Sequence, residues 1–376
     1  MLYFRFMFKS CTLLLVLFGF SQCRNINPVN SNSTNKDERN FSRVISLSNL
    51  KATEFVPTLE STCSKDKNII YSPTFLFAWN EIRQSLQQPI KINSSDIYLS
   101  LINTSGSYKN SLNAGEYDKE ISIDDNVLNI RAYFKQSLPF DGDLDTLNKP
   151  FKFKGTNVNA FGMPDYYEPL AKKIDILYYK NDEEFIIKLI PKNSHHEIIL
   201  AKGFNNITRL DSVLINISAK IKIGDTERRD TAIWWRYELN SDDRVIIPIL
   251  NFNLETHYSQ VEGDTIHVSS KQYEIRTAYQ RIAFILDQHG AKVESEADVA
   301  VAAAAAPPDN RIHPKLLLFN SPFIVLLRKL EKPPYFMMKV ENAELMKLWT
   351  GKIVEVKLID PPSIDPSSPP SPMPKK

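Results

Sequence analysis

The feature that most constrains this chain is a succession of short apolar runs rich in β-branched and aromatic residues. Each run is bounded by Asn, Asp, Gly or Pro, which are typical of turns. Such runs predict short strands joined by turns rather than a bundle of long helices. We expect strands at residues 127–134, 185–190, 198–200, 213–223, 245–252, 281–286, 315–327 and 335–340. The chain is therefore predicted to be dominated by strands, with few helices.

One helix is predicted where apolar residues switch to helical spacing. Residues 69–71 form a short apolar strand, Ser72 can cap a helix, and Pro73 suits a first helical turn. The apolar residues that follow at helical spacing are Phe75, Leu76, Trp79, Ile82 and Leu86. We therefore expect a strand followed at once by an amphipathic helix.

The N-terminal residues are typical of an export signal. Arg5 and Lys9 precede an apolar run at residues 11–20, which is shorter than the ~18 residues that a spanning helix needs. We predict a signal peptide at residues 1–22, a flexible tether at 23–43 and an exported product. Cys23 is placed where a bacterial lipoprotein carries its lipid, so lipid attachment at the outer surface and simple cleavage remain alternatives. A single domain is expected at 44–355, followed by a disordered Pro- and Ser-rich tail at 356–376.

Missing motifs exclude many enzyme classes. The 11 glycines are spaced too widely for G-x-G-x-x-G, a P-loop or a G-x-S-x-G turn. The cysteines form no C-x-x-C pair, and His195-His196-Glu197 lacks the second histidine of a zincin. Without residues 1–22 the chain has 44 basic and 44 acidic side chains, because only Arg5 and Lys9 of the 46 are lost. We therefore expect no catalytic residues, cofactor, metal or nucleic-acid partner.

Residues 291–298 alternate strictly between small and charged side chains. The odd positions are Ala291, Val293, Ser295 and Ala297, and the even positions are Lys292, Glu294, Glu296 and Asp298. Period two predicts a strand with one buried and one solvated face. An alanine-rich stretch follows at 300–306, which on its own would also suit a simple linker.

Several segments, in order along the chain, resemble the serpin family of protease inhibitors. Asn68-Ile69-Ile70-Tyr71-Ser72-Pro73 resembles the family's Asn-x-x-x-Ser-Pro helix start, and Ala132-Tyr133-Phe134-Lys135 its Tyr-Phe-Lys stretch. Phe161-Gly162-Met163 and Ile247-Pro248-Ile249-Leu250 resemble two further serpin strands. The strongest matches are Phe319-Asn320-Ser321-Pro322-Phe323, which resembles Phe-Asn-x-Pro-Phe, and residues 334–342, which resemble Leu-Phe-Met-Gly-x-Val-x-Asn.

The resemblance implies an α+β serpin-like fold with a large central sheet, additional sheets and an exposed reactive loop at about 290–314. It implies a hinge at Gly290, Ala291, Val293, Ser295 and Ala297. Counting along the family's loop places the scissile bond at Ala304-Ala305, with Arg311-Ile312 as the alternative. The implied partner is a serine protease, of the elastase type more than the trypsin type, trapped when the cleaved loop inserts into the sheet.

The chain also departs from the family pattern. The spacing leaves no room for several peripheral helices, Leu138 replaces a tryptophan and Gln280 replaces a histidine that many members bury. These departures favour the alternative hypothesis of a non-inhibitory serpin-fold protein that serves as a surface binding module.

Overall fold

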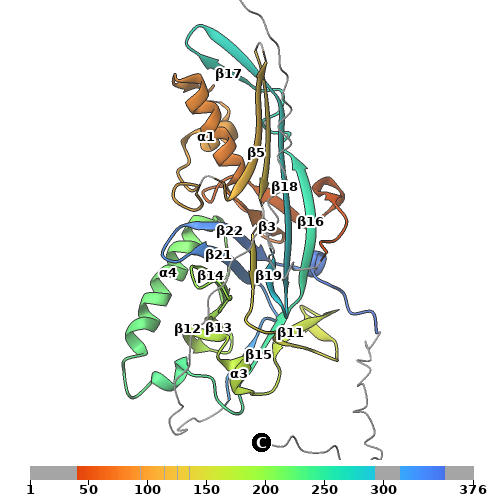
Figure 1. The fold of residues 1–376 in the computed structure, drawn as a ribbon, viewed down its shortest axis with the longest axis vertical. Helices are drawn as coiled ribbons and strands as arrows, with labels where there is room; N and C mark the ends of the chain where they lie inside the picture. Colours follow the sequence, from red (N-terminus) through yellow and green to blue (C-terminus); the bar gives the residue numbers. More distant parts are fainter. Residues whose placement is uncertain are drawn as a thin grey trace, which may run out of the picture. The chain divides into compact units, whose positions relative to one another are not determined.

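The structure is a computed structural model, and it describes residues 40–93, 95–113, 115–124, 126–134, 136–292 and 314–351. Backbone contacts divide the chain into residues 1–40 and residues 41–376. All strands and helices of the described residues belong to the second unit (Figure 1).

Among the described residues, a nine-stranded sheet is built around the 17-residue strand β18 (Lys271–Asp287). The other strands of this sheet are β1 (Ile45–Ser46), β4 (Ile90–Lys91), β5 (Tyr117–Asp124), β6 (Val127–Phe134), β7 (Ser137–Pro139), β16 (Leu250–His257), β17 (Thr265–Val268) and β19 (Gly290–Lys292). One side of β18 pairs with β17 and β16, both antiparallel. The other side pairs first with β6, in parallel, and then with β19, antiparallel.

Within the same ranges, three smaller sheets complete the architecture. A seven-stranded sheet contains β12 (Ile174–Asn181), β13 (Glu184–Leu189), β14 (His196–Lys202), β21 (Phe323–Lys329), β22 (Pro334–Val340), β3 (Asn68–Tyr71) and β2 (Thr53–Val56), in that order. A four-stranded sheet contains β20 (Leu316–Leu318), β15 (Arg244–Pro248), β11 (Ala160–Met163) and β8 (Asp145–Thr146). A hairpin joins β9 (Phe151–Phe153) to β10 (Thr156–Val158).

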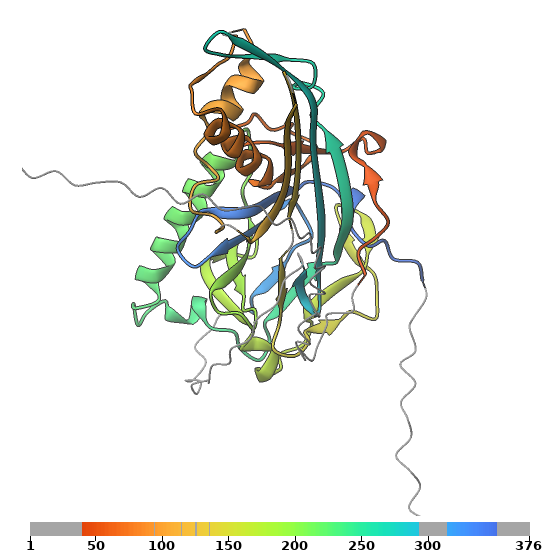
Figure 2. The same cartoon turned by 45° about the horizontal axis from the view of Figure 1, so that its top comes forward.

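The described part of the chain contains four α-helices: α1 (Thr74–Leu86), α2 (Ile97–Thr104), α3 (Glu168–Ala171) and α4 (Leu210–Glu227). Short 3₁₀ turns occur at Leu47–Asn49, Trp234–Tyr237 and Ala343–Leu345. Helix α1 packs beside β5 and β6, and α4 packs beside β12 (Figures 1 and 2). The α+β fold class, with a large sheet, additional sheets and few helices, is confirmed.

The core lies between the large sheet and the seven-stranded sheet. Phe284 of β18 stacks on Phe336 of β22, with ring centroids 4.5 Å apart, and both side chains are fully buried. On β18 the residues from Ala278 to Leu286 at even positions are buried against this core. The face of β18 that carries its odd positions is therefore the outer face of the large sheet over most of this length.

The strand predicted at 213–223 is wrong, because this segment belongs to helix α4. Its isoleucines at 215, 217, 221 and 223 alternate like those of a strand, which made the composition misleading. The residues that the fold buries are instead Leu210, Val213 and Ile217, spaced three and four apart as on one helix face. Ile215 is correspondingly 70% exposed.

Two other predicted strands are each divided in the structure. The segment 245–252 forms β15 and β16, which belong to different sheets and separate at Ile249. The segment 315–327 forms β20 and the start of β21, separated by the turn around Asn320 and Pro322. The strands predicted at 127–134, 185–190, 198–200, 281–286 and 335–340 are confirmed, with boundaries that shift by up to a few residues or, for 281–286, extend into the longer β18.

Candidate functional site

The predicted hinge begins as a short strand inside the large sheet. Strand β19 lies between β18 and β7 and is antiparallel to both, with Ala291 opposite Leu286 on one side and Leu138 on the other. All three of these side chains are fully buried. Strands β18 and β6 pair directly up to Ile282, and beyond that point β19 separates β18 from β7. The sheet therefore has an opening at this end that the first hinge residues already occupy.

Gly290 is the residue that lets the chain turn into this opening. Its φ is +119°, and a Cβ at this position would lie 2.3 Å from the carbonyl oxygen of Leu138. The preceding turn is held by its backbone, since His289 accepts a 3.0 Å hydrogen bond from the Phe140 N–H. Glycine is thus required here both for its positive φ and for its missing side chain.

Lys292 corrects one expectation from the sequence. The alternation predicts that Lys292 faces solvent, but its side chain is only 6% exposed. Its ammonium lies 5.5 Å from the ring centroid of Phe41, which belongs to the segment that precedes β1. The outer face of the sheet is therefore covered at this point by a residue far away in the sequence.

The other predicted site residues lie outside the described residues. These are the hinge positions Val293, Ser295 and Ala297, the candidate cleavage positions Ala304, Ala305, Arg311 and Ile312, and the candidate lipid-bearing Cys23. The signal peptide at 1–22 and the tail at 356–376 also lie outside them.

Beyond β19, strands β6 and β18 close the sheet by direct parallel pairing. The paired residues run from Val127 and Glu274 to Phe134 and Ile282. On the outer face, Tyr279 of β18 lies beside two residues of β6. The guanidinium of Arg131 lies 6.0 Å from the Tyr279 ring centroid, and the Tyr133 ring 6.3 Å from it. Any additional strand entering behind β19 has to separate β6 from β18.

A buried polar network fastens β18 to the start of helix α1. The Gln280 side chain is 1% exposed, and its amide nitrogen donates to Thr74 Oγ1 (2.5 Å) and to the Ser72 carbonyl oxygen (3.3 Å). The Gln280 amide oxygen accepts a hydrogen bond from the Tyr258 hydroxyl. Burial raises the pKa of Tyr258 well above its usual value, so the phenol remains a donor. The glutamine that replaces a histidine is thus fully hydrogen-bonded.

The C-terminal end of the loop is anchored by charges that are buried next to β20. The Lys315 ammonium lies 2.9 Å from Asp243 Oδ2, and both side chains are fully buried. Asp243 Oδ1 also accepts from the Lys315 N–H at 2.7 Å. The Lys202 ammonium donates to the Leu318 carbonyl oxygen at 3.0 Å. The position where the chain returns from the loop is therefore fixed.

These anchoring residues could not be found from the sequence. Lys202 and Lys315 each stand at the edge of an apolar run, where a lysine usually marks the end of a strand in solvent. Asp243 looks like an ordinary turn residue in the segment Asn240-Ser241-Asp242-Asp243. Only the packing of β20 against residues 235 and 243 brings the Lys315 ammonium and the Asp243 carboxylate together.

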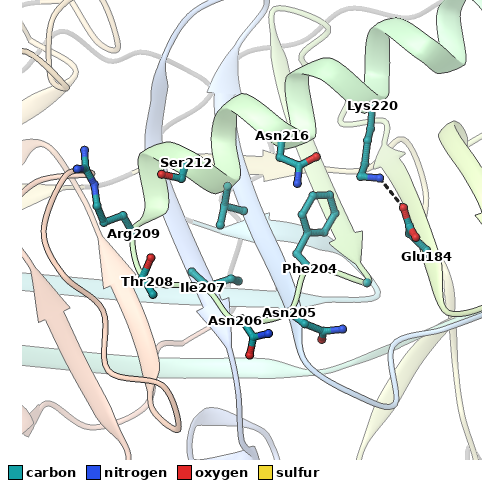
Figure 3. Close-up of a pocket in the computed structure, with 12 residues that line it drawn as sticks. Glu184, Phe204, Asn205, Asn206, Ile207, Thr208, Arg209, Ser212, Asn216 and Lys220 are labelled. Atoms are coloured by element: carbon teal, nitrogen blue, oxygen red, sulfur yellow. Dashed lines mark hydrogen bonds and ion pairs between the residues drawn. The ribbon is translucent and has the colours of Figure 1, made fainter.

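A separate pocket of about 320 Å³ lies between the start of α4 and residues 203–209 (Figure 3). Its lining is mostly polar, with Asn205, Asn206 and Asn216 around Phe204, and Lys220 pairs with Glu184 at its edge. It contains none of the residues predicted for the loop site. Over the described ranges, no group of side chains is arranged to hold a metal ion. No single helix in those ranges is both long enough and apolar enough to cross a membrane.

No protein-family model matches the sequence. No curated protein matches it either.

Solved structures similar to this chain include several described as serpins, the family that its motifs resemble. Serpin48 of the insect Tenebrio molitor, described as a highly specific serpin, is 13% identical, with 73% of this chain and 92% of that chain covered at a TM-score of 0.39. A serpin from the trematode Schistosoma haematobium is 10% identical, with 73% and 94% covered at 0.39. Thyroxine-binding globulin in complex with thyroxine is 11% identical, with 74% and 93% covered at 0.37.

Proposed function

We propose that this chain is a serpin-like inhibitor of serine proteases that acts by cleavage of the loop at about 290–314 and insertion of its N-terminal part between β18 and β6. The observation that carries the proposal is the position of β19 at the end of the seam between these strands. A strand that has already started between β18 and β7 can lengthen by adding residues on the same ladder. In the family that the motifs resemble, this insertion displaces the acylated protease before water completes the reaction.

Continuing the register of β19 would give each loop residue a partner in the inserted state. On β18, Lys292 pairs with Ile285, so Val293 would pair with Phe284, Ser295 with Ile282, Ala297 with Gln280 and Val299 with Ala278. All four of these β18 residues are buried in the core. The small odd-numbered loop residues would therefore lie on the core face, as antiparallel partners share one face of a sheet.

The acidic even-numbered residues would then lie on the outer face beside arginines. Continuing the β18 ladder places Glu296 opposite Arg281, and continuing the β7 ladder places Asp298 opposite Arg131. Both arginines are at least partly exposed on that face. Opposite charges across a ladder contribute roughly 0.2–1 kcal/mol per pair, so these acids would favour insertion.

The proposal is tested by mixing the purified protein with an elastase-type and a trypsin-type serine protease. A stable higher-mass adduct on denaturing gels, cleavage within residues 302–306 and a nicked product that resists heat better than the intact protein are expected. Cleavage without an adduct and without a gain in heat resistance would contradict the inhibitory mechanism.

The predicted face of each loop residue allows a matched pair of variants. Val299→Glu would place a carboxylate among buried residues next to Ala278 at a cost of several kcal/mol, and the protein should become a substrate. Ala300→Glu introduces the same side chain at the next residue, which would lie on the outer face. This variant should therefore still form the adduct. Equal behaviour of the two variants would contradict the proposed register.

The runner-up is a non-inhibitory serpin-fold protein that acts as a surface binding module. The observation that favours it is the direct parallel pairing of β6 with β18, irregular only between Ile275 and Thr277, because insertion has to break this pairing. If that seam never opens, the nicked protein will melt at the same temperature as the intact one.

We also propose that the chain is exported, with Cys23 either lipidated at the outer surface or removed from a freely secreted product. The support is the sequence of residues 1–23. The N-terminal residue of the mature protein, read by mass spectrometry, tests this, because an uncleaved Met1 would contradict both forms.

A further inference from the structure

The segment that follows residue 40 runs over the large sheet close to the hinge. Ile45 and Ser46 pair in parallel with Leu254 and Glu255 of β16. Before that, the Ser42 N–H donates to Asn251 Oδ1 (3.2 Å), and the Ser42 carbonyl oxygen accepts from Asn253 Nδ2 (3.0 Å). We call residues 41–46 the N-terminal strap.

Residues 41 and 42 of the strap contact side chains of the outer face, the face that carries Lys292, and residues 45 and 46 join the sheet as its edge strand. Asn251 pairs with Ile285, and Ile285 pairs with Lys292, so the three residues form one row across β16, β18 and β19. Residues in one such row share a face of the sheet. Phe41, next to the Asn251-bonded Ser42, reaches Lys292 at the end of this row, and Lys292 is 6% exposed beneath it.

A second row connects the strap with β18. Asn253 is 4% exposed, and its side chain bonds Ser42 on one side and accepts from Arg281 Nε (2.9 Å) on the other. Asn253 therefore links the strap to Arg281 of β18. Arg281 lies two residues before Ala283, which is the β18 partner of Asn253.

We propose that the N-terminal strap holds the hinge in the sheet, with Phe41 acting as the clamp on Lys292. The described part of β19 comprises three residues, so a contact beyond its ladder adds appreciably to what holds this part of the hinge. Phe41 adds a cation–π contact to a lysine that is shielded from water, which is where such contacts are strongest. The strap would thereby keep β19 docked between β18 and β7, which is the first step of loop insertion. Loss of the strap would then slow the insertion of the residues that follow β19.

This inference has one part that is independent of the proposed function and one part that rests on it. Docking of β19 is a property of the uncleaved protein and can be measured without any protease. Faster insertion after cleavage follows only if the loop inserts at all.

The first experiment measures hydrogen exchange of the full chain in a peptide that spans Gly290–Lys292. Phe41→Ala should speed exchange of these amides about tenfold, because the clamp is lost. Lys292→Met keeps the aliphatic stem and removes the charge, so a smaller increase is expected. Tyr167→Ala is the matched control, since it removes an aromatic ring that is 60% exposed and far from β19 in the sequence. Unchanged exchange in Phe41→Ala would overturn the inference.

The second experiment follows the gain of heat resistance after the loop is cut by an elastase-type protease. Phe41→Ala should acquire it several-fold more slowly than the parent protein and Tyr167→Ala at the parent rate. If the parent protein gains no heat resistance, the proposed function fails, and the exchange experiment still decides whether the strap holds the hinge. If the parent gains it and Phe41→Ala gains it equally fast or faster, the strap does not assist insertion.

Discussion

Replacing Asp243 with alanine should destabilise the protein severely, because it leaves the Lys315 ammonium buried without its carboxylate. The two side chains are fully buried, and their charged atoms are 2.9 Å apart. Asp243 also accepts backbone hydrogen bonds from the N–H groups of Lys315 (2.7 Å) and Asn240 (3.0 Å). The change therefore removes an ion pair and two anchors of the chain at once.

The magnitude follows from burial. Removing one partner of a buried ion pair costs about 3–5 kcal/mol, because the remaining charge is stranded in a poorly solvated site. The double variant Asp243→Asn with Lys315→Met removes both charges, and the single asparagine oxygen can still accept one of the two backbone bonds. It should therefore cost less than Asp243→Ala, since no charge is left unpaired in the core and only one backbone bond is lost.

Urea unfolding monitored by tryptophan fluorescence measures both values. The matched control is Glu168→Ala, which breaks the exposed pair between Glu168 and Lys172 at 2.6 Å. An exposed pair one helical turn apart contributes about 0.3–0.5 kcal/mol, so this control should unfold almost like the parent. If Asp243→Ala loses no more than the control, or if the double variant is less stable than Asp243→Ala, the account of this anchor is refuted.

Three further predictions concern the hinge, the pH dependence and the N-terminus. Gly290→Ala should undock β19, since its Cβ would lie 2.3 Å from the Leu138 oxygen, and hydrogen exchange at residues 290–292 should quicken. Burial, together with the Asp96 carboxyl, raises the pKa of Asp264 to about 6, so the folded state takes up this proton first and Asp264 by itself adds stability as pH falls from about 6 to 4. Burial lowers the pKa of His196 to about 4, which opposes that gain, so Asp264→Asn should expose a net loss of stability in urea titrations over this range. Cys23→Ala should abolish fatty-acid labelling if the chain is a lipoprotein.

Strands that bury one or both faces could be predicted from the sequence, since their composition and bounding turns are local. Strand β6 has the predicted boundaries, and β22 differs by one residue. Helix α4 shows where this reasoning fails. Its isoleucines satisfy a period of two and its buried residues satisfy a period of 3.6, and only packing against β12 selects the second.

The site was less predictable, because its main contacts join residues that are far apart in the chain. The alternation correctly places Ala291 on the buried face, but Lys292 is covered by Phe41, some 250 positions earlier, which no local pattern indicates. The Asp243–Lys315 pair is invisible for the same reason. A lysine in the sequence carries no sign of whether a distant carboxylate will be folded against it.

The pairing of the large sheet changes the effect on insertion that we expect from the acidic residues of the loop. Carboxylates in a segment that has to enter a sheet would ordinarily count against insertion, and the loop carries three, Glu294, Glu296 and Asp298. In the proposed inserted state, continuing the register of β19 would place all three on the outer face, two of them opposite Arg281 and Arg131, and none would have to enter the core. Their solvation is largely retained on an exposed face, so the desolvation cost that excludes a buried carboxylate does not apply. In the proposed mechanism the step that would limit insertion is instead the separation of β6 from β18, and the small side chains at odd positions are the feature of the loop that would suit that step.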